Sequence, residues 1–458
     1  MEYFFSIIIP TRHRPEFIKE SLKHIKTQSY KNYEVIVCDN YTDVSLSCEN
    51  YCKKSGIKKM KYVKPTKPVG MVENWNLALN YATGDYILYL TDKMFLLPHT
   101  LKNLNAIAVK TKAEIINWVD DIYTPKDFAD YFGKGYYSKN ESGANDTQFV
   151  FFNPIEELSK KGDAELSRQE QSKSSYVRGK ICFGAFKKEL VQRLVNKYSR
   201  IFYNITPDYT SMILALVEAK SGVEIGRAGI VHLNTDISNG RLASASDVHA
   251  NNYLRDLADY SSILETMLIK GLYSSVNNMV ARDYLYIKEK SGSSFRFNKL
   301  NWLMYIKEDI FSEQKIWSSE AVKNNQIGLY NDYVESLPLA EKEILNKSTA
   351  IRQAQHDFQK QQIEDAAKKQ ASYYKELERI VKEKYELKKK TLLGKVKEII
   401  KNFIPSIILK ILMKYLDQIK NPKLYAKPYD LTMDKAIKKN SLILKKSMNV
   451  RNSRNPLT

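Results

Sequence analysis

Polar and charged side chains follow directly on three short apolar runs in the first part of the chain. The runs are Phe4–Ile9, Tyr33–Cys38 and Tyr86–Leu90, and their β-branched and aromatic residues predict buried strands. Ligands of open α/β sheets bind beyond the carboxyl ends of the strands, so side chains placed there are candidates for one ligand site. These side chains belong to Pro10, Thr11 and Arg12, to Asp39 and Asn40, and to Thr91, Asp92 and Lys93.

The elements that would position these residues alternate between strands and helices. Pro15 opens a helix that continues to Gln28 and has an apolar stripe. This alternation predicts an α/β fold with a doubly wound mixed sheet, a Rossmann-like core, followed by a mostly α-helical C-terminal region. Further strands are expected at 60–63, 113–119, 181–186 and 223–232, and further helices at 70–82, from 188 and at 208–219.

Composition changes divide the chain into four expected segments. They are an α/β domain at 1–245, a helical domain at 246–340, a charged long helix or coiled-coil-like segment at 341–390, and a basic amphipathic tail at 391–458. Residues 124–177 are polar and turn-rich, which predicts a long surface excursion. The small-residue loop 234–246 could be a lid over a ligand or an ordinary linker.

Four segments resemble, in order and spacing, the glycosyltransferase family 2 enzymes of the GT-A fold, of the bacterial surface-polysaccharide type. The resemblance covers about the first 240 residues and does not extend to the rest of the chain. One such motif alone is weakly specific, whereas four in register are strongly specific. The segments are Ser6–Arg12, Tyr33–Asn40, Val69–Asn76 and Ala82–Asp92.

The resemblance implies a role for each matching position. Asp39 would accept a hydrogen bond from the base, usually uracil in this family, because a carboxylate can accept from the imide N–H. Gly70 and Asn74 would border the ribose and diphosphate, where a glycine permits close backbone approach. The rest of the nucleotide and donor pocket would be formed by Pro10, Thr11, Arg12, Asn40, Thr91, Asp92 and Lys93.

Asp92 falls at the metal-binding DxD position of the family, where relatives carry two or three acidic residues. This chain has Thr91-Asp92-Lys93 there, whereas Mg²⁺ or Mn²⁺ takes several oxygen ligands. Two alternatives follow. Either a divalent metal is held weakly by Asp92 with help from His232, or Lys93 binds the diphosphate as a point cation without a metal.

Asp208 is the candidate general base that would deprotonate the acceptor in an inverting transfer. It lies at a predicted helix start and resembles an acidic residue that family 2 enzymes carry at the start of a later helix. A first-turn or N-cap carboxylate is the alternative. Further candidates are Asp120 and Asp121 as bases, Trp118 as a sugar-stacking or core side chain, and Arg178 and Lys180 as phosphate-facing or solvated cations.

The composition indicates a globular protein with a strongly basic end. Charged residues make up 27% of the 458 residues, which argues against a polytopic membrane protein. The net charge is +20, and residues 381–458 carry +14 of it, from 20 Lys and Arg against 6 Asp and Glu. The four cysteines lack a zinc-site spacing and are expected to be free thiols in a reducing cytoplasm. No signal peptide is recognisable at Met1.

Residues 391–417 combine apolar clusters with lysines and one proline, Pro405. Their longest uncharged stretch, Asn402–Leu409, is too short for a membrane span. The pattern predicts an amphipathic helix at an anionic membrane surface, with a helix docked on the protein itself as the alternative. We therefore expect a cytoplasmic protein that is peripheral at the inner face of the membrane and able to oligomerise through 341–390.

The function that these observations predict is transfer of a sugar from a nucleotide-diphosphate donor, a UDP-sugar, to a glycan or lipid-linked acceptor in cell-surface polysaccharide synthesis. Lys93 at the metal position keeps two alternatives open, a catalytically inactive GT-A scaffold and a membrane-associated interaction protein. The basic tail alone would suit nucleic acid, but the chain has no recognised nucleic-acid module, so no nucleic-acid partner is expected.

Overall fold

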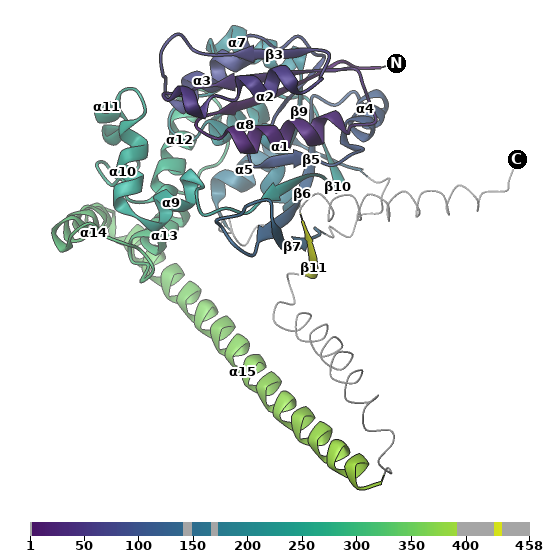
Figure 1. Cartoon of the computed structure of the whole chain (residues 1–458). Helices are drawn as coiled ribbons and strands as arrows, with labels where there is room; N and C mark the ends of the chain where they lie inside the picture. Colours follow the sequence, from purple (N-terminus) through teal and green to yellow (C-terminus); the bar gives the residue numbers. More distant parts are fainter. Residues whose placement is uncertain (1, 141–148, 166–172, 392–425, 433–458) are drawn as a thin grey trace, which may run out of the picture. The chain divides into compact units, whose positions relative to one another are not determined.

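The structure is a computed structural model that describes the chain except residues 1, 141–148, 166–172, 392–425 and 433–458 (Figure 1). By their contacts, the described residues within Met1–Ser336 and Pro428–Thr458 form one compact unit, and those within Leu337–Lys427 form a second. The helices expected at 246–340 thus fall almost entirely in the same unit as the α/β core. The domain boundary expected at residue 245 stays a prediction.

Eleven strands among the described residues form one mixed sheet. Its main path runs β11-β7-β6-β9-β4-β1-β2-β3, and β10 pairs with β5, β6 and β8. The neighbours β1–β2, β1–β4, β2–β3 and β6–β10 are parallel, whereas β9 is antiparallel to β4 and β6. The strands are β1 (Phe5–Thr11), β2 (Tyr33–Asp39), β3 (Met60–Val63), β4 (Tyr86–Tyr89), β5 (Met94–Leu96), β6 (Ile115–Pro125), β7 (Lys134–Ser138), β8 (Phe149–Phe152), β9 (Gly184–Lys187), β10 (Gly222–Leu233) and β11 (Ala426–Thr432).

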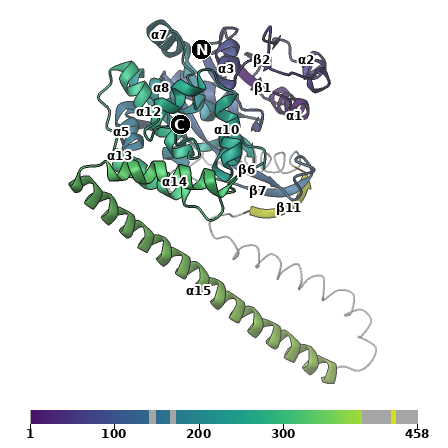
Figure 2. The same cartoon turned by 90° about the vertical axis from the view of Figure 1, so that its left-hand side faces the viewer.

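Helices cover both faces of this sheet, which is why β1 and β2 are mostly apolar. Every residue of these two strands is buried. Figure 2 shows α1 and α2 beyond one side of β1 and β2, and α8 and α12 beyond the other. The predicted doubly wound α/β fold is therefore confirmed. The helices of the core are α1 (Pro15–Lys26), α2 (Glu49–Lys54), α3 (Met71–Leu79), α4 (Thr100–Thr111), α5 (Pro154–Asp163), α6 (Lys173–Val177), α7 (Lys188–Tyr198) and α8 (Pro207–Glu218), with short 3-10 turns at Val44–Leu46 and Ile181–Phe183.

Two expected loops contain regular structure instead. The segment 124–177 contributes β7, β8, α5 and α6, and its Leu158 and Val177 side chains are fully buried. Its glycines misled the prediction, because Gly135 lies inside β7, where a Cβ would meet the backbone of Thr124. The loop expected at 234–246 contains helix α9 (Asn239–Ala245), in which small alanine and serine residues pack without a marked apolar stripe.

The region after the core is helical, as predicted. α12 packs on α8 and α13 packs on α12 within the first unit. In the second unit, α15 (Leu339–Thr391) contains the segment 341–390, for which the sequence predicts a long helix or a coiled-coil-like segment. No helix among the described residues has the length and apolar character needed to cross a membrane. The other helices are α10 (Asp247–Arg255), α11 (Tyr260–Glu265), α12 (Val276–Ser291), α13 (Lys299–Ile310) and α14 (Glu320–Glu335).

Candidate functional site

The carboxyl ends of β1, β2 and β4 meet at one edge of the sheet. Thr11 at the end of β1 lies opposite Asp39 at the end of β2, and Ile8 lies opposite Tyr89 at the end of β4. Asp92 follows β4 closely enough for its Oδ2 to lie 3.4 Å from Thr11 Oγ1. The structure thus brings together the three strand ends that the sequence singled out.

Asp39 is a buried carboxylate with one oxygen left to accept a hydrogen bond. Its Oδ2 accepts from the Cys48 backbone N–H at 2.9 Å and from the Tyr62 hydroxyl at 3.0 Å. Its Oδ1 is buried and has no hydrogen-bond partner among the described residues. Leaving a buried acceptor unpaired costs about 1–3 kcal/mol, so a ligand N–H placed here would be bound favourably.

Asn40 and Asn74 use their side-chain amides to hold the protein's own backbone. Asn40 donates to the Val69 carbonyl at 2.7 Å and accepts from the Val69 N–H at 3.1 Å. Asn74 donates to the Cys38 carbonyl at 3.2 Å and accepts from the Cys38 thiol at 3.1 Å. These amides therefore fix the protein backbone beside Asp39. Direct contact between either amide and a bound nucleotide-sugar stays a prediction.

Gly70 and Arg12 lie beneath the end of helix α10. Gly70 is the N-cap of α3, and a Cβ at this position would come within 3.2 Å of the Asp256 carbonyl oxygen. The Asp256 carboxylate pairs with Arg12 at 2.7 Å. Sequence reasoning missed Asp256 because it lies 244 residues from its partner. Pro10 stays inside β1, paired with Cys38 across the sheet.

Asp92 forms an ion pair with Arg14, a residue that the sequence analysis did not select. Arg14 Nη1 lies 2.9 Å from Asp92 Oδ1, and Arg14 Nη2 donates to the Ile237 carbonyl at 3.1 Å. Arg14 holds the N-cap position of α1, directly before Pro15. The sequence signal that could have identified Arg14 is its position, because it is a cationic residue only three residues after β1 ends at Thr11.

The turn around Asp92 carries more cationic than acidic groups. Burial lowers the pKa of Lys93, Asp92 opposes this effect, and Arg14 adds to it. His232 pairs with Asp120 instead, its Nδ1 lying 3.4 Å from the Asp120 carboxylate.

The donor set at this turn does not fit a divalent metal. Both Asp92 oxygens already contact neighbours, one of them the Arg14 guanidinium. Across the described residues no three His, Cys, Asp or Glu side chains gather in an arrangement that could hold a metal ion. A hard cation requires several oxygen ligands, so neither Asp92 alone nor a pair of Asp92 and His232 makes a metal site.

The second-rank candidates on β6 are built into the core. Asp121 is buried, accepts from the Tyr137 hydroxyl at 2.5 Å and from the Asn140 N–H at 2.9 Å, and its pKa is raised by burial. Trp118 is 1% exposed and packs so tightly on Gly229 that a Cβ there would come within 2.6 Å of the ring. Trp118 is therefore a core side chain and offers no face to a sugar.

Asp208 lies in the first turn of α8, and 36% of its side chain is exposed. Its Oδ2 lies 3.6 Å from the ammonium of Lys180, which is itself buried. The Lys180 Nζ atom also lies 3.9 Å from the ring centroids of both Tyr176 and Tyr209. Burial acts to lower the pKa of Lys180, but these tyrosines and Asp208 outweigh it and raise the pKa. Asp208 is thus an accessible carboxylate beside a fixed cation.

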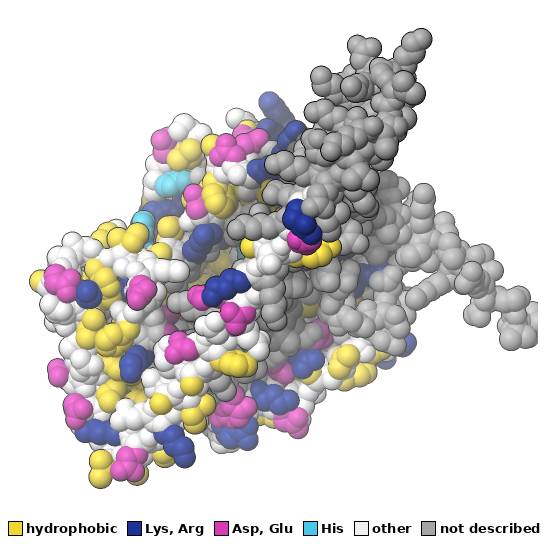
Figure 3. Space-filling model, turned by 90° about the horizontal axis from the view of Figure 1, so that it is seen from below, with side chains coloured by type: hydrophobic (Ala, Val, Ile, Leu, Met, Phe, Trp, Pro, Cys, Tyr) yellow, Lys and Arg dark blue, Asp and Glu magenta, His cyan; other side chains and the backbone are white. Residues whose placement is uncertain are grey.

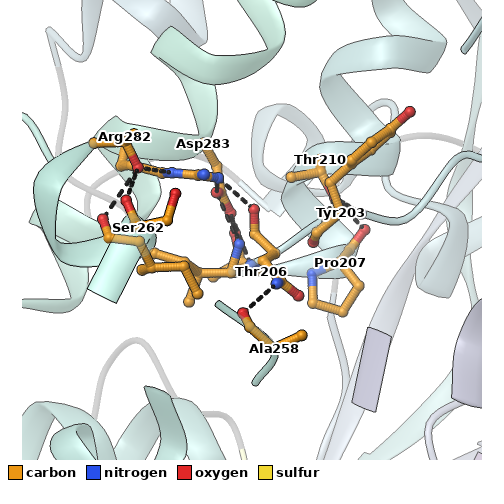
Figure 4. Close-up of polar contacts among 12 residues, drawn as sticks. Tyr203, Thr206, Pro207, Thr210, Ala258, Ser262, Arg282 and Asp283 are labelled. Carbon is orange, nitrogen blue, oxygen red and sulfur yellow. Dashed lines mark hydrogen bonds and ion pairs between the residues drawn. The ribbon is translucent and has the colours of Figure 1, made fainter. Parts of the chain in front are cut away.

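The loop that leads into α8 and Asp208 is held by α12, as Figure 4 shows. The buried Asp283 carboxylate accepts from the Ile205 N–H at 2.8 Å and from the Thr206 N–H and hydroxyl at 2.7 and 2.5 Å. Arg282 donates to the Asn204 carbonyl at 2.5 Å and pairs with Asp283 at 3.1 Å. Sequence reasoning selected none of these supporting residues, because they lie 77 and 78 residues from the loop.

Helix α10 contacts both the Asp208 loop and the strand-end pocket. The Tyr253 hydroxyl donates to the Ile205 carbonyl at 2.7 Å, and Asp256 at the end of the same helix pairs with Arg12. The loop before α8 and the carboxyl end of β1 therefore lie close enough together to contact the same short helix, α10. This arrangement can place a nucleotide at the strand ends and a base at the start of α8.

Comparison with known proteins gives a match over the first third of the chain. Residues 6–149 match the model of the family described as "Glycosyl transferase family 2". The GalNAc(5)-diNAcBac-PP-undecaprenol beta-1,3-glucosyltransferase of Campylobacter jejuni is 29% identical over 100 residues, which are 22% of this chain and 32% of that protein. The chain thus matches about a third of the length of this curated relative.

Two solved structures are also similar to this chain. S. aureus TarS has a TM-score of 0.40 and 12% identity, covering 75% of this chain and 55% of TarS. The mannosyltransferase PcManGT from Pyrobaculum calidifontis has a TM-score of 0.36 and 15% identity, covering 77% of this chain and 81% of that protein.

The family match and the mixed α/β sheet together indicate a protein with a glycosyl transferase family 2 core. Residues 6–149 belong to glycosyl transferase family 2. The predicted family is therefore confirmed for these residues. The activity of the whole protein, its donor, its acceptor and the roles of individual residues belong to the proposal below.

Proposed function

We propose that this protein transfers a sugar from a UDP-sugar to a glycan or lipid-linked acceptor, with inversion at the anomeric carbon, in cell-surface polysaccharide synthesis. The observation that carries the proposal is the buried Oδ1 acceptor of Asp39 at the meeting point of β1, β2 and β4. Uracil presents an imide N–H of the kind this oxygen can accept. The Campylobacter jejuni relative, whose name gives a PP-undecaprenol-linked glycan, supports a lipid-linked acceptor.

In the proposed reaction Asp208 is the general base. The acceptor hydroxyl oxygen forms a bond to the anomeric carbon, the bond from that carbon to the diphosphate oxygen breaks, and the hydroxyl proton moves to the Asp208 carboxylate. UDP leaves with the electrons of the broken bond. The Lys180 ammonium lies 3.6 Å from Asp208 Oδ2 and holds the carboxylate in place at the start of α8.

A donor screen tests this proposal. The full chain is incubated with UDP-, GDP-, dTDP- and CMP-sugars, and release of the free nucleotide is followed with water or a glycan as acceptor. We expect release from a UDP-sugar and a loss of the preference for uridine nucleotides in Asp39→Asn. The exposed Asp332→Asn on α14 is the matched control and should behave as wild type.

The same screen distinguishes the alternative functions. UDP binding without release from any donor would favour the inactive GT-A scaffold. Failure to bind any of the nucleotides would reject the proposed donor pocket. The remaining alternative function would then be that of a membrane-associated interaction protein.

The proposed location is the inner face of a membrane, reached through the basic tail. Most of the tail, 392–425 and 433–458, lies outside the described residues, so its amphipathic helix stays a prediction. On the face seen in Figure 3, Lys and Arg side chains are interspersed with Asp and Glu. Flotation of the full chain with anionic vesicles but not with neutral ones is the expected result, and equal flotation or none would contradict it. Oligomer formation through 341–390 is tested by the mass of the full chain in solution.

A further inference from the structure

Arg14 occupies the place beside Asp92 where a second acidic side chain would be needed for a metal. Its guanidinium lies 2.9 Å from the Asp92 carboxylate, and 22% of the Arg14 side chain is exposed. Asp92 is the only acidic side chain in the stretch 91–97, which reads Thr-Asp-Lys-Met-Phe-Leu-Leu. The turn after β4 thus holds a guanidinium beside its one carboxylate.

Two contacts fix the Arg14 guanidinium in place. One is the charged pair with Asp92, and the other is the 3.1 Å hydrogen bond from Nη2 to the Ile237 carbonyl. A guanidinium has five N–H donors, so these two bonds leave donors for a ligand. A planar guanidinium held in this way is well suited to bidentate binding of phosphate oxygens.

We propose that Arg14 binds the diphosphate of the donor and stabilises it as the leaving group, so that this protein binds its nucleotide without a divalent metal. The inference rests on the proposed function, since it assigns a ligand to the same pocket. Asp92 then acts as a positioning residue that orients Arg14, and the 234–238 segment is coupled to the donor through Ile237.

The charge balance favours this assignment. A diphosphate brings at least two negative charges next to the strand ends, where Asp92 alone would repel it. Pairing with Arg14 neutralises the Asp92 carboxylate, and the neighbouring Lys93 side chain adds a second cation. Stabilisation of the leaving diphosphate by Arg or Lys is an established alternative to stabilisation by a metal ion.

Calorimetric titration with uridine and with UDP tests the proposal on the full chain, in a chelator and then in Mn²⁺ or Mg²⁺. We expect wild type to bind UDP more tightly than uridine, with the same affinity in every buffer. Arg14→Ala should weaken UDP binding roughly tenfold to a hundredfold, the loss expected for a charge-assisted contact, and leave uridine binding unchanged. Arg14→Lys should lie between the two.

Two further variants keep the test decisive. Lys23→Ala removes one positive charge from an exposed position of the same helix and should leave both affinities unchanged. Asp92→Asn should retain binding of UDP in chelator, because Arg14 remains, so this variant serves if Arg14→Ala does not fold. Thermal melting of each variant confirms that it is folded.

Binding of UDP that requires Mn²⁺ or Mg²⁺ in wild type, or that is lost in chelator with Asp92→Asn, would overturn the proposal. An equal loss of uridine and UDP affinity in folded Arg14→Ala would also overturn it, since Arg14 would then support the pocket and not the diphosphate. Wild type that binds neither uridine nor UDP would instead reject the proposed function itself.

Discussion

The strand-end pocket and the Asp208 loop are built in different ways. Thr11, Asp39 and Asp92 are placed by the parallel register of β1, β2 and β4, all within the first part of the chain. Asp208 depends on a loop whose backbone is held by Asp283, far along the chain in α12. Under the proposed function, the α/β core would supply the donor half of the site, whereas the helical region that follows it would position the base.

Helix α10 is the point where these halves meet. Tyr253 binds the loop carbonyl of Ile205, and Asp256 pairs with Arg12 at the end of β1. The two contacts differ in exposure, since Tyr253 is partly buried while the Arg12 and Asp256 side chains are 38% and 53% exposed. We therefore expect changes in the base loop to have larger effects than changes at the Arg12 contact.

The largest expected effect is on the chemical step. Asp208→Asn removes the proposed base and should lower kcat by roughly 10²–10⁴-fold. The affinity for UDP should not change, because the donor half is built without this residue. Steady-state release of UDP and calorimetric titration measure the two quantities, with Asp332→Asn as the control. Normal turnover by Asp208→Asn would show that another group is the base.

The next effect concerns the support of the base loop. Asp283→Asn leaves Arg282 beside a neutral partner and weakens the bonds to two backbone N–H groups. Breaking such a buried pair should lower the free energy of unfolding by about 3 kcal/mol. In protein that remains folded, kcat should fall while the UDP affinity is retained. A fall in UDP affinity as large as the fall in kcat would mean that α12 supports the donor pocket as well.

A pH-dependent effect is expected at the opposite end of β2. Burial acts to raise the pKa of Glu34, but hydrogen bonds from Lys61, Ser6 and Thr83 outweigh it and hold the pKa below its usual value. A carboxyl whose folded pKa is lowered stabilises the fold above its unfolded pKa, and this contribution is lost as the pH falls through the folded pKa.

Glu34→Gln should therefore be less stable than wild type at neutral pH, by about 1–3 kcal/mol, and the difference should shrink in acid. Urea unfolding at several pH values measures this. A stability difference that is constant from neutral to acidic pH would contradict the role of the ionised carboxylate.

The smallest expected effect is at the contact between Arg12 and Asp256. Because both side chains are well exposed, Asp256→Asn should change the free energy of unfolding by less than about 1 kcal/mol. Urea unfolding at low and high salt measures the difference, which should be smaller at high salt. A loss of several kcal/mol would show that α10 and the core are coupled more strongly than the exposure of this pair indicates.

The strand-end residues could be predicted because they depend on local pattern. An apolar run followed by Asp39 or Asp92 specifies both a buried strand and the residue at its carboxyl end. The pairing of Arg14 with Asp92 could not be read in this way. His13 adopts a left-handed conformation with a φ of 58°, which turns the chain between Arg12 and Arg14. Periodicity does not predict such a turn at a histidine.

The support of the base could not be predicted for a different reason. Asp283 lies within α12, whose sequence pattern is explained by the apolar residues that the helix buries. That pattern therefore does not predict a role for the Asp283 carboxylate. Its partners are the backbone N–H groups of Ile205 and Thr206 in a distant loop. Backbone groups are present at almost every residue, so the side-chain types of that loop do not identify them as partners.

The ion pairs of Asp92 with Arg14 and of His232 with Asp120 could not be predicted either, because these partners come from other strands and turns. A metal held by Asp92 and His232 stays an untested prediction.

The most direct test of the account is a UDP titration of wild type, Asp39→Asn and Asp208→Asn, paired with release of UDP from a UDP-sugar. The account predicts that wild type binds and turns over. Asp39→Asn should raise the Kd for UDP by roughly tenfold, and Asp208→Asn should leave that Kd unchanged while turnover is lost. Wild-type affinity in Asp39→Asn, or weakened UDP binding in Asp208→Asn, would contradict the division of the site into a donor half and a base half.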